Sequence, residues 1–356
     1  MIDFAGLRDN LKLRARADAA WRKVVPRPQQ VHISITDRCN LSCEHCDIWM
    51  KPVPGEVPIE RWKEVVDECR EWLGPFTLKI VGGEPLLKEG VVELIAHAKE
   101  RGCRVGLSTN AIPLSNPDRA QEMVDTGLDE IHISLESFTP DHHDQIRKRA
   151  GAHARTVKAI GELTRRRTHL QVSLATVVCQ QNLDELLKMV DFVRDHGLYT
   201  VNYQPLYANF GRPFDPRWYE TSPYFPRDVD KLDAVLDRLV EIRTAEWLVG
   251  NTVNQLQMMK VYFRNPNADD QVVCKAGDDD IAFDPYGNLK MCFWLDPVGN
   301  IRDEQPKAAY WSEEARERRR EVRSCTRNCN LLNCNFDRER FGEALWTRLG
   351  IGAARG

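Results

Sequence analysis

The chain has 356 residues, of which 42% are hydrophobic and 29% charged, and its formal net charge is −3 at pH 7. This composition is typical of a globular protein with a substantial core, and the near-balanced charge predicts no general attraction to nucleic acid or to a bilayer. No apolar run approaches the roughly 18 residues of a membrane-spanning helix, and the charged N-terminus lacks a signal-peptide pattern, so we expect a cytoplasmic protein.

Apolar, β-branched runs alternate with helical patterns along the first two thirds of the chain. The expected strands are 31–36, 77–81, 103–108, 129–136, 170–178 and 199–206. The expected helices are 59–73, 91–102, 117–127, 156–167, 182–197, 228–243 and 253–263. Strands that are separated by helices pair in parallel, and such sheets place their chemistry at the carboxyl ends of the strands.

Eleven cysteines are present, and a reducing cytosol disfavours disulfides between them. Cys69, Cys103 and Cys179 stand alone, and we interpret them as buried apolar thiols. The other eight fall in two groups, at 39–46 and at 274–334, which indicates metal ligands.

The first group is Cys39-x3-Cys43-x2-Cys46, directly after the first expected strand. Three thiolates at this spacing can hold three irons of a 4Fe-4S cluster, which needs four ligands, so that one iron stays open for a small molecule. The alternatives are a structural zinc site or a chance spacing.

This spacing, the strand–helix alternation and the turn Gly82-Gly83-Glu84-Pro85 after the second strand together resemble the radical S-adenosylmethionine (SAM) superfamily. The resemblance implies a partial (β/α)6 parallel barrel in an α/β fold. It also implies that Cys39, Cys43 and Cys46 hold a 4Fe-4S cluster whose open iron binds an exchangeable SAM.

The resemblance further implies which residues contact SAM. The glycine-rich turn, Gly82, Gly83 and Glu84, offers backbone groups to the methionine end, because glycine permits close approach. His45 occupies the position of a ring beside adenine, and Ser134 and Glu136 end the fourth strand where the ribose and methionine are contacted. The sequence assigns no catalytic acid or base.

The second group consists of Cys274, Cys292, Cys325, Cys329 and Cys334. Pro285-Tyr286-Gly287 predicts a hairpin before Cys292, and the whole pattern resembles the SPASM/twitch domains that hold auxiliary 4Fe-4S clusters. Five cysteines suffice for one such cluster and not for two. Cys274 and Cys292 are the firmest ligands, and the sequence does not choose among the other three. A structural zinc site is the alternative.

We therefore expect an α/β barrel followed by a small irregular iron–sulfur domain. The expected segments are an N-terminal helical extension (1–30), the partial barrel (31–207), a linker with helices (208–263), the auxiliary cluster domain (264–340) and a C-terminal tail (341–356).

The resemblance implies reductive cleavage of SAM to a 5′-deoxyadenosyl radical, which abstracts hydrogen from a substrate, with flavodoxin or ferredoxin as the electron donor. Our first hypothesis for the substrate is a small polar metabolite, such as a sugar or cyclitol. The second hypothesis is maturation of a ribosomally made peptide. About 30 residues precede the first strand, which are too few for a peptide-binding winged-helix domain and favour the first hypothesis. A non-enzymatic metal-binding scaffold is the third hypothesis.

Overall fold

The computed structural model describes residues 27–51, 53–166, 169–208, 214–268, 276–278 and 280–325, together with residues 274, 327 and 329. The predicted N-terminal extension up to residue 26, Cys334 and the predicted tail lie outside these residues. No helix within them is long and apolar enough to cross a membrane.

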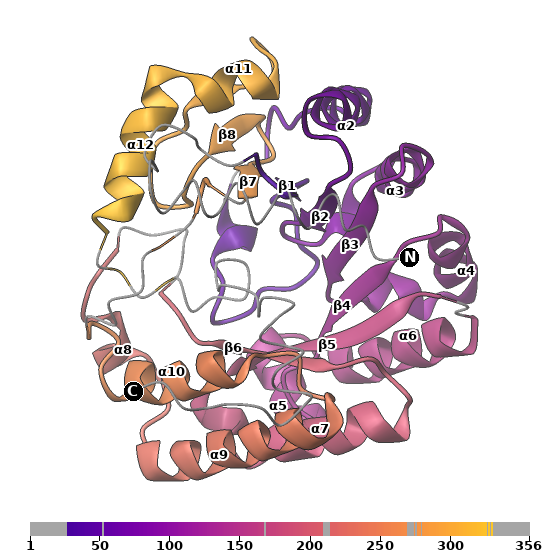
Figure 1. The fold of residues 1–356 in the computed structure, drawn as a ribbon. Coiled ribbons are helices and arrows are strands. Elements are labelled where there is room, and N and C mark those ends of the chain that lie inside the picture. The colour runs from indigo at the N-terminus through magenta and orange to yellow at the C-terminus, as the bar shows by residue number, and fades with distance from the viewer. Residues whose placement is uncertain are drawn as a thin grey trace.

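The described residues form one curved sheet in the order β6-β5-β4-β3-β2-β1-β7-β8-β9 (Figure 1). Its strands are β1 (Gln30–Ser34), β2 (Thr77–Val81), β3 (Arg104–Thr109), β4 (Glu130–Ser134), β5 (Gln171–Val178), β6 (Val201–Pro205), β7 (Asp280–Phe283), β8 (Asn288–Lys290) and β9 (Gly299–Asn300). Strands β1 to β7 pair in parallel, whereas β8 and β9 are antiparallel. The predicted mostly parallel α/β fold is confirmed, and the six predicted strands end within two residues of β1 to β6.

Strand β7 adds a connection that the sequence did not predict. It pairs in parallel with β1, with Val31 opposite Ile281 and Ile33 opposite Phe283. The predicted hairpin is present, because β7 turns through residues 284–287 into the antiparallel strand β8. The cysteine-rich C-terminal part therefore continues the barrel sheet on its open side. The predicted domain boundaries stay predictions.

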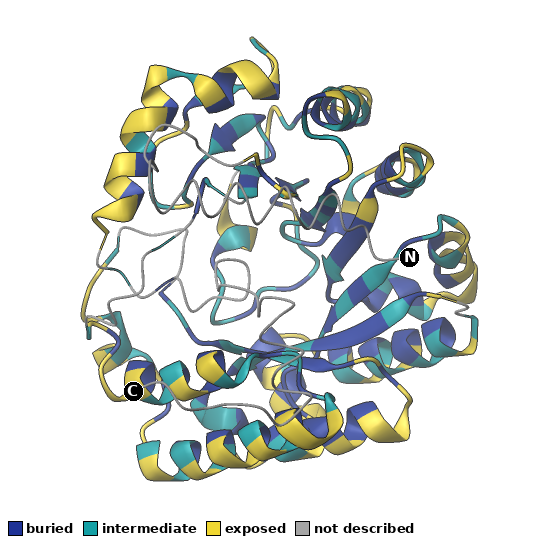
Figure 2. Cartoon of the chain, viewed as in Figure 1, coloured by how far each residue is buried: buried dark blue, intermediate teal, exposed yellow. Residues whose placement is uncertain are grey.

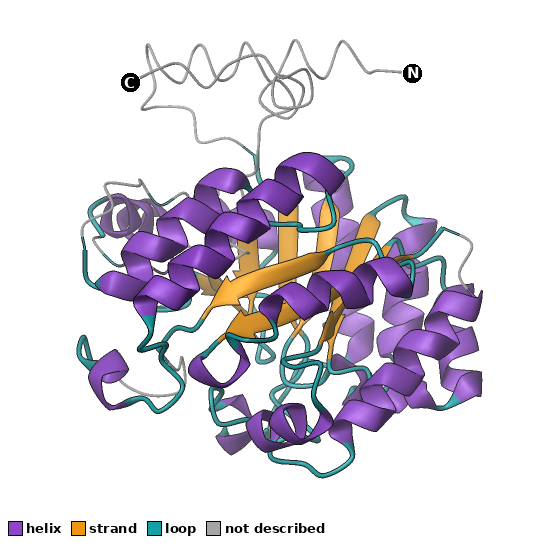
Figure 3. Cartoon of the chain, turned by 90° about the horizontal axis from the view of Figure 1, so that it is seen from below, coloured by secondary structure: helices purple, strands orange, loops and turns teal. Residues whose placement is uncertain are grey.

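Helices cover the outside of the sheet, and their buried faces point toward it (Figures 2 and 3). They are α2 (Ile59–Leu73), α3 (Val91–Glu100), α4 (Pro117–Asp125), α5 (Pro140–Arg147), α6 (Ala152–Arg166), α7 (Leu186–Asp195), α8 (Trp218–Thr221), α9 (Val229–Glu246), α10 (Val253–Arg264), α11 (Pro306–Trp311) and α12 (Glu313–Arg323). Helix α5 was not predicted. Its start signal is Pro140 at the first helical position after Thr139, which suits the fixed φ of proline.

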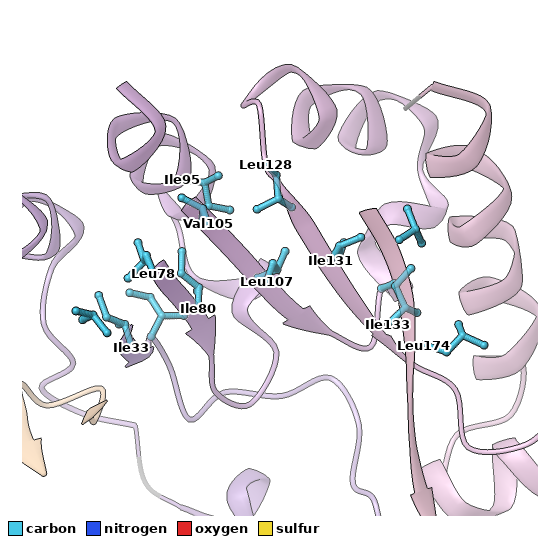
Figure 4. Close-up of a cluster of buried hydrophobic side chains, with 14 of the residues drawn as sticks. Ile33, Leu78, Ile80, Ile95, Val105, Leu107, Leu128, Ile131, Ile133 and Leu174 are labelled. Carbon is cyan, nitrogen blue, oxygen red and sulfur yellow. The ribbon is translucent and has the colours of Figure 1, made fainter. Parts of the chain in front are cut away.

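The centre of the core contains side chains that occupy the same row of neighbouring strands, with helix side chains packed against them (Figure 4). Ile33, Ile80, Leu107 and Ile131 are successive partners across β1 to β4, and all four are fully buried. Burial of each such side chain contributes about 1.5–3 kcal/mol. This packing aligns the carboxyl ends of the parallel strands along one edge, so the loops that follow them lie together.

Candidate functional site

The cysteine loop leaves β1 at this edge. The Ile35 amide still donates to the Val81 carbonyl at 2.9 Å, which extends the β1–β2 pairing to the start of the loop. Beyond it, Cys43 is buried in a small apolar cluster, against which Cys39 and Cys46 also pack. The structure thus brings the three predicted ligands together.

The environment of these thiols disfavours their ionised form. Burial, together with the negative charge of neighbouring thiolates, raises the pKa of Cys39 to about 11. Burial likewise raises the pKa of Cys46. Thiolates at this site therefore require a compensating positive charge, such as that of a bound metal cluster.

The glycine turn after β2 lies directly against the cysteine loop. The Gly83 amide donates to the Thr36 carbonyl at 2.8 Å, and the Glu84 amide donates to the Arg38 carbonyl at 2.7 Å. A Cβ atom on Gly83 would lie 2.2 Å from the Arg38 carbonyl oxygen. Gly82 has a φ of +140°, and its Cβ would lie 2.5 Å from the Thr36 carbonyl oxygen. Both positions therefore need glycine, because backbone occupies the space of a side chain.

Glu84 is fully buried and connects three loops. Its carboxylate accepts hydrogen bonds from the Leu86 amide at 3.1 Å, the Thr109 hydroxyl at 2.6 Å and the Asn110 amide at 2.8 Å. Asn110 in turn donates to the Asn40 side chain, at 2.7 Å, inside the cysteine loop. These contacts give Glu84 a positioning role. Its predicted contact with SAM stays a prediction.

The end of β4 supplies the next predicted residues. Ser134 is the last residue of the strand and is partly buried. Glu136, which is 2% exposed, accepts a hydrogen bond from the Val177 amide at 2.7 Å. The pKa of His45 is lowered to about 4 because burial disfavours the charged ring, so the imidazole is neutral at pH 7. A neutral ring is suited to packing beside an uncharged aromatic base.

Arg147 is a site residue that the sequence reasoning missed. It is buried at the last position of α5, where one guanidinium nitrogen donates to Glu136 and the other donates to the Cys43 sulfur at 3.5 Å. Burial lowers the pKa of this guanidinium, but the charges of Cys43 and Glu136 outweigh burial and raise it. Its Nε has no partner in the described part of the protein. A buried cation thus faces the cysteine loop.

The donor set of these residues fits a 4Fe-4S cluster, in which each thiolate binds its own iron. Among the described residues, no three His, Cys, Asp or Glu side chains are close enough to bind one ion. The thiolates of a cubane bind different irons and are therefore farther apart than the ligands of one ion. Cys39, Cys43 and Cys46 supply three such thiolates, and the buried Arg147 supplies positive charge beside a negatively charged cluster.

The second cysteine group surrounds a cavity beside β1, β7 and β8. Cys274, Cys292 and Cys329 line this cavity, which also contacts His32 and Asp280. Cys325 is exposed, yet its charge raises the pKa of all three. The structure therefore brings four of the five predicted cysteines together, and Cys334 lies outside the described residues.

Backbone and a buried arginine support this second group. The Trp294 amide donates to the Cys292 sulfur at 3.4 Å, and the Arg327 amide to the Cys325 sulfur at 3.5 Å. Arg319 of α12 is buried, donates to the Gly277 carbonyl at 3.2 Å and stacks on the Tyr310 ring. It thereby holds α12 against the loop that follows Cys274. An arginine-rich run is usually a solvated face, which is why the sequence did not reveal this role.

Comparisons with known proteins agree with this geometry. Residues 33–193 match the model of the Radical SAM superfamily. The AdoMet-dependent heme synthase of Nitratidesulfovibrio vulgaris is 32% identical over 151 residues, which are 42% of this chain and 40% of that protein. The PqqA peptide cyclase of Ruegeria pomeroyi is 31% identical over 175 residues, or 49% of this chain and 46% of the cyclase. The chain thus aligns with less than half the length of either relative.

Solved structures match a larger share of the chain. Streptococcus suis SuiB bound to S-adenosylmethionine superposes with a TM-score of 0.65 and 13% identity, covering 87% of this chain and 71% of SuiB. SuiB has also been crystallised with the precursor peptide SuiA, and this form has a TM-score of 0.64 and 12% identity over 88% of this chain and 71% of SuiB. At such identity the likeness shows the fold alone. Residues 33–193 therefore form a radical SAM domain, and the relatives that match it are named as enzymes.

Proposed function

We propose that this protein is a radical SAM enzyme that modifies a peptide, with one 4Fe-4S cluster on Cys39, Cys43 and Cys46 and an auxiliary 4Fe-4S cluster near β7. The observation that carries the proposal is the grouping of three thiols beside the buried Arg147, at the carboxyl edge of a parallel sheet. A cluster bound there supplies the electron that cleaves SAM to methionine and a 5′-deoxyadenosyl radical.

The chain's own residues hold and orient the cofactors. Arg147 places positive charge between Glu136 and Cys43, where it stabilises the negative charge of the cluster and of a SAM carboxylate. Gly82 and Gly83 let the turn pack directly against the cysteine loop, since a side chain at either position would collide with that loop. The backbone of the turn would then contact the methionine end of SAM. His45, neutral at pH 7, packs beside adenine.

We assign the ligands of the auxiliary cluster as Cys274, Cys292, Cys325 and Cys329. Each of these thiols lies within electrostatic reach of others in the set, and three of them line one cavity. Zinc could bind four thiolates but has no redox chemistry. A cubane at this position could accept an electron, which suits a reaction that oxidises its substrate.

A peptide is the substrate class that the comparisons support best. A PqqA peptide cyclase is among the relatives, and the structural neighbour SuiB has been crystallised with a precursor peptide. Our first hypothesis, a sugar or cyclitol, has no comparable support. Flavodoxin or ferredoxin as the electron donor stays a prediction.

The proposal is tested with anaerobically reconstituted protein, SAM and dithionite. We expect about eight irons per chain, four for each cubane, and formation of 5′-deoxyadenosine. In the Cys39/Cys43/Cys46→Ala chain about half of the iron should remain and 5′-deoxyadenosine should disappear. About four irons and one zinc in the unmodified protein would contradict the auxiliary cluster.

The substrate class needs a separate assay. A short peptide that is encoded next to the gene is incubated with the enzyme, and its mass is compared before and after turnover. A mass change that requires SAM and all three cysteines supports the peptide proposal. Turnover of a sugar or cyclitol, with the peptide unchanged, would contradict it.

A further inference from the structure

A tyrosine without a role in the proposed cofactor binding connects the barrel to the second cysteine group. Tyr207 lies two residues after β6, at the carboxyl edge where the cysteine loop also lies. Its ring belongs to an aromatic cluster, with ring centroids 6.2 Å from Trp294 and 6.3 Å from Tyr262. Trp294 lines the same cavity as the cysteines. The ring of Tyr207 is therefore fixed beside this cavity.

The hydroxyl of Tyr207 hydrogen-bonds the Cys329 side chain. A phenol carries its proton at neutral pH and a cluster-bound thiolate has none to give, so the hydroxyl is the donor. Cys329 is 6% exposed and lines the cavity with Cys274 and Cys292. The bond is therefore directed at the sulfur of a proposed cluster ligand in a partly desolvated place, where hydrogen bonds are electrostatically strong.

A positive charge accompanies this bond. The Arg327 guanidinium lies 5.2 Å from the centroid of the Trp294 ring and 4.6 Å from that of Phe214, whose ring stacks with Tyr207. The aromatic cluster thus holds a cation within electrostatic reach of Cys292.

Hydrogen bonds to cluster sulfurs and nearby positive charges set the potential of an iron–sulfur cluster. One-electron reduction adds a negative charge to the cluster, and a donor aimed at a sulfur stabilises that added charge. We propose that Tyr207 tunes the auxiliary cluster, with its hydroxyl bond to Cys329 raising the reduction potential. The inference rests on the proposed function, because it requires a 4Fe-4S cluster on these cysteines. The step involves one electron only, and no bond is made or broken.

The test compares two Tyr→Phe substitutions in one aromatic cluster. Tyr207→Phe removes the hydroxyl from Cys329 and keeps the ring. Tyr262→Phe is the matched control, because its buried hydroxyl donates to the Leu206 carbonyl at 2.6 Å and its ring stacks on Tyr207. Both are made in the full-length Cys39/Cys43/Cys46→Ala chain, so that any cluster signal comes from the auxiliary site.

The measurement is a redox titration of the reconstituted protein followed by electron paramagnetic resonance. We expect Tyr207→Phe to lower the equilibrium constant for reduction about tenfold, which is about 59 mV toward negative potential for one electron. Tyr262→Phe should leave the midpoint unchanged. Equal midpoints in the two variants would overturn the inference.

Other results have distinct meanings. If Tyr207→Phe alone loses the cluster, the hydroxyl holds the cluster and does not tune it, which also overturns the inference. If the chain binds no iron before either tyrosine is changed, the auxiliary cluster of the proposed function fails, and the tuning role fails with it. The midpoint therefore tests Tyr207, and the iron content tests the cluster.

Discussion

Arg147→Met should destabilise the protein strongly, because it removes the cation from a buried ion pair. The Arg147 side chain is 9% exposed and that of Glu136 is 2% exposed, so the pair is not screened as a surface salt bridge would be. After the substitution the Glu136 carboxylate keeps its bond from the Val177 amide and loses its charged partner. Breaking a buried pair in this way costs about 3–5 kcal/mol.

The assay is urea unfolding of the full-length chain under reducing, metal-free conditions. Glu136→Gln is added alone and together with Arg147→Met, since the double variant has neither charge. We expect the double variant to be more stable than the sum of the single losses predicts, with a coupling energy of about 0.5–3 kcal/mol. Arg155→Met is the control, because this partly exposed arginine binds only nearby backbone carbonyls in the described structure. Its effect should stay within about 0.5 kcal/mol.

Strict additivity of Arg147→Met and Glu136→Gln would refute the ion-pair reasoning. If Arg147→Met lowers the free energy of unfolding no more than Arg155→Met does, the Arg147 guanidinium is solvated in solution. A SAM-binding titration of the reconstituted variants adds a functional measurement. Arg147→Met should weaken binding while Arg155→Met should not.

Three further predictions concern the loops around the site. Gly83→Ala should displace the cysteine loop, because the new Cβ would lie 2.2 Å from a backbone carbonyl oxygen. The variant should lose about half of the bound iron. The control Gly161→Ala should retain all of the iron, because its Cβ meets only a flexible side-chain end at 3.6 Å. Burial lowers the pKa of His143 to about 2, so below pH 6.5 the unfolded chain binds a proton that the folded chain excludes. The free energy of unfolding should therefore fall by about 1.4 kcal/mol for each pH unit below 6.5 because of this histidine. Urea unfolding at pH 7 and pH 5 should show a smaller fall for His143→Asn than for the unmodified chain. Tyr286→Phe removes the hydroxyl that donates to Asp37 at 3.2 Å and should lower the free energy of unfolding by about 0.5–1.5 kcal/mol. An unchanged midpoint of urea unfolding would contradict this hydrogen bond.

Local patterns in the sequence determined much of the barrel. Strands β1 to β6 were predictable because their β-branched, apolar runs are bounded by turn residues and separated by helices of regular period. The cysteine spacing and the Gly82-Gly83 turn were equally readable, since a glycine pair directly after a strand marks a close backbone approach. The β7–β8 hairpin was predictable because Pro285-Tyr286-Gly287 contains residues that favour a tight turn.

Only the tertiary structure decided the long-range contacts. Strand β7 pairs with β1 across roughly 250 residues of chain, and no local pattern specifies the partner of a short strand. Arg147 follows a polar stretch that reads as a loop, and its contacts join Glu136, on the preceding strand end, and Cys43, which is 104 residues away in sequence. The gathering of Cys325 and Cys329 near Cys274 and Cys292 depends on how the chain after α12 returns to the cavity. Sequence thus determined which residue types and elements occur, whereas packing decided which charged and thiol groups meet, because those contacts join segments that are independent along the chain.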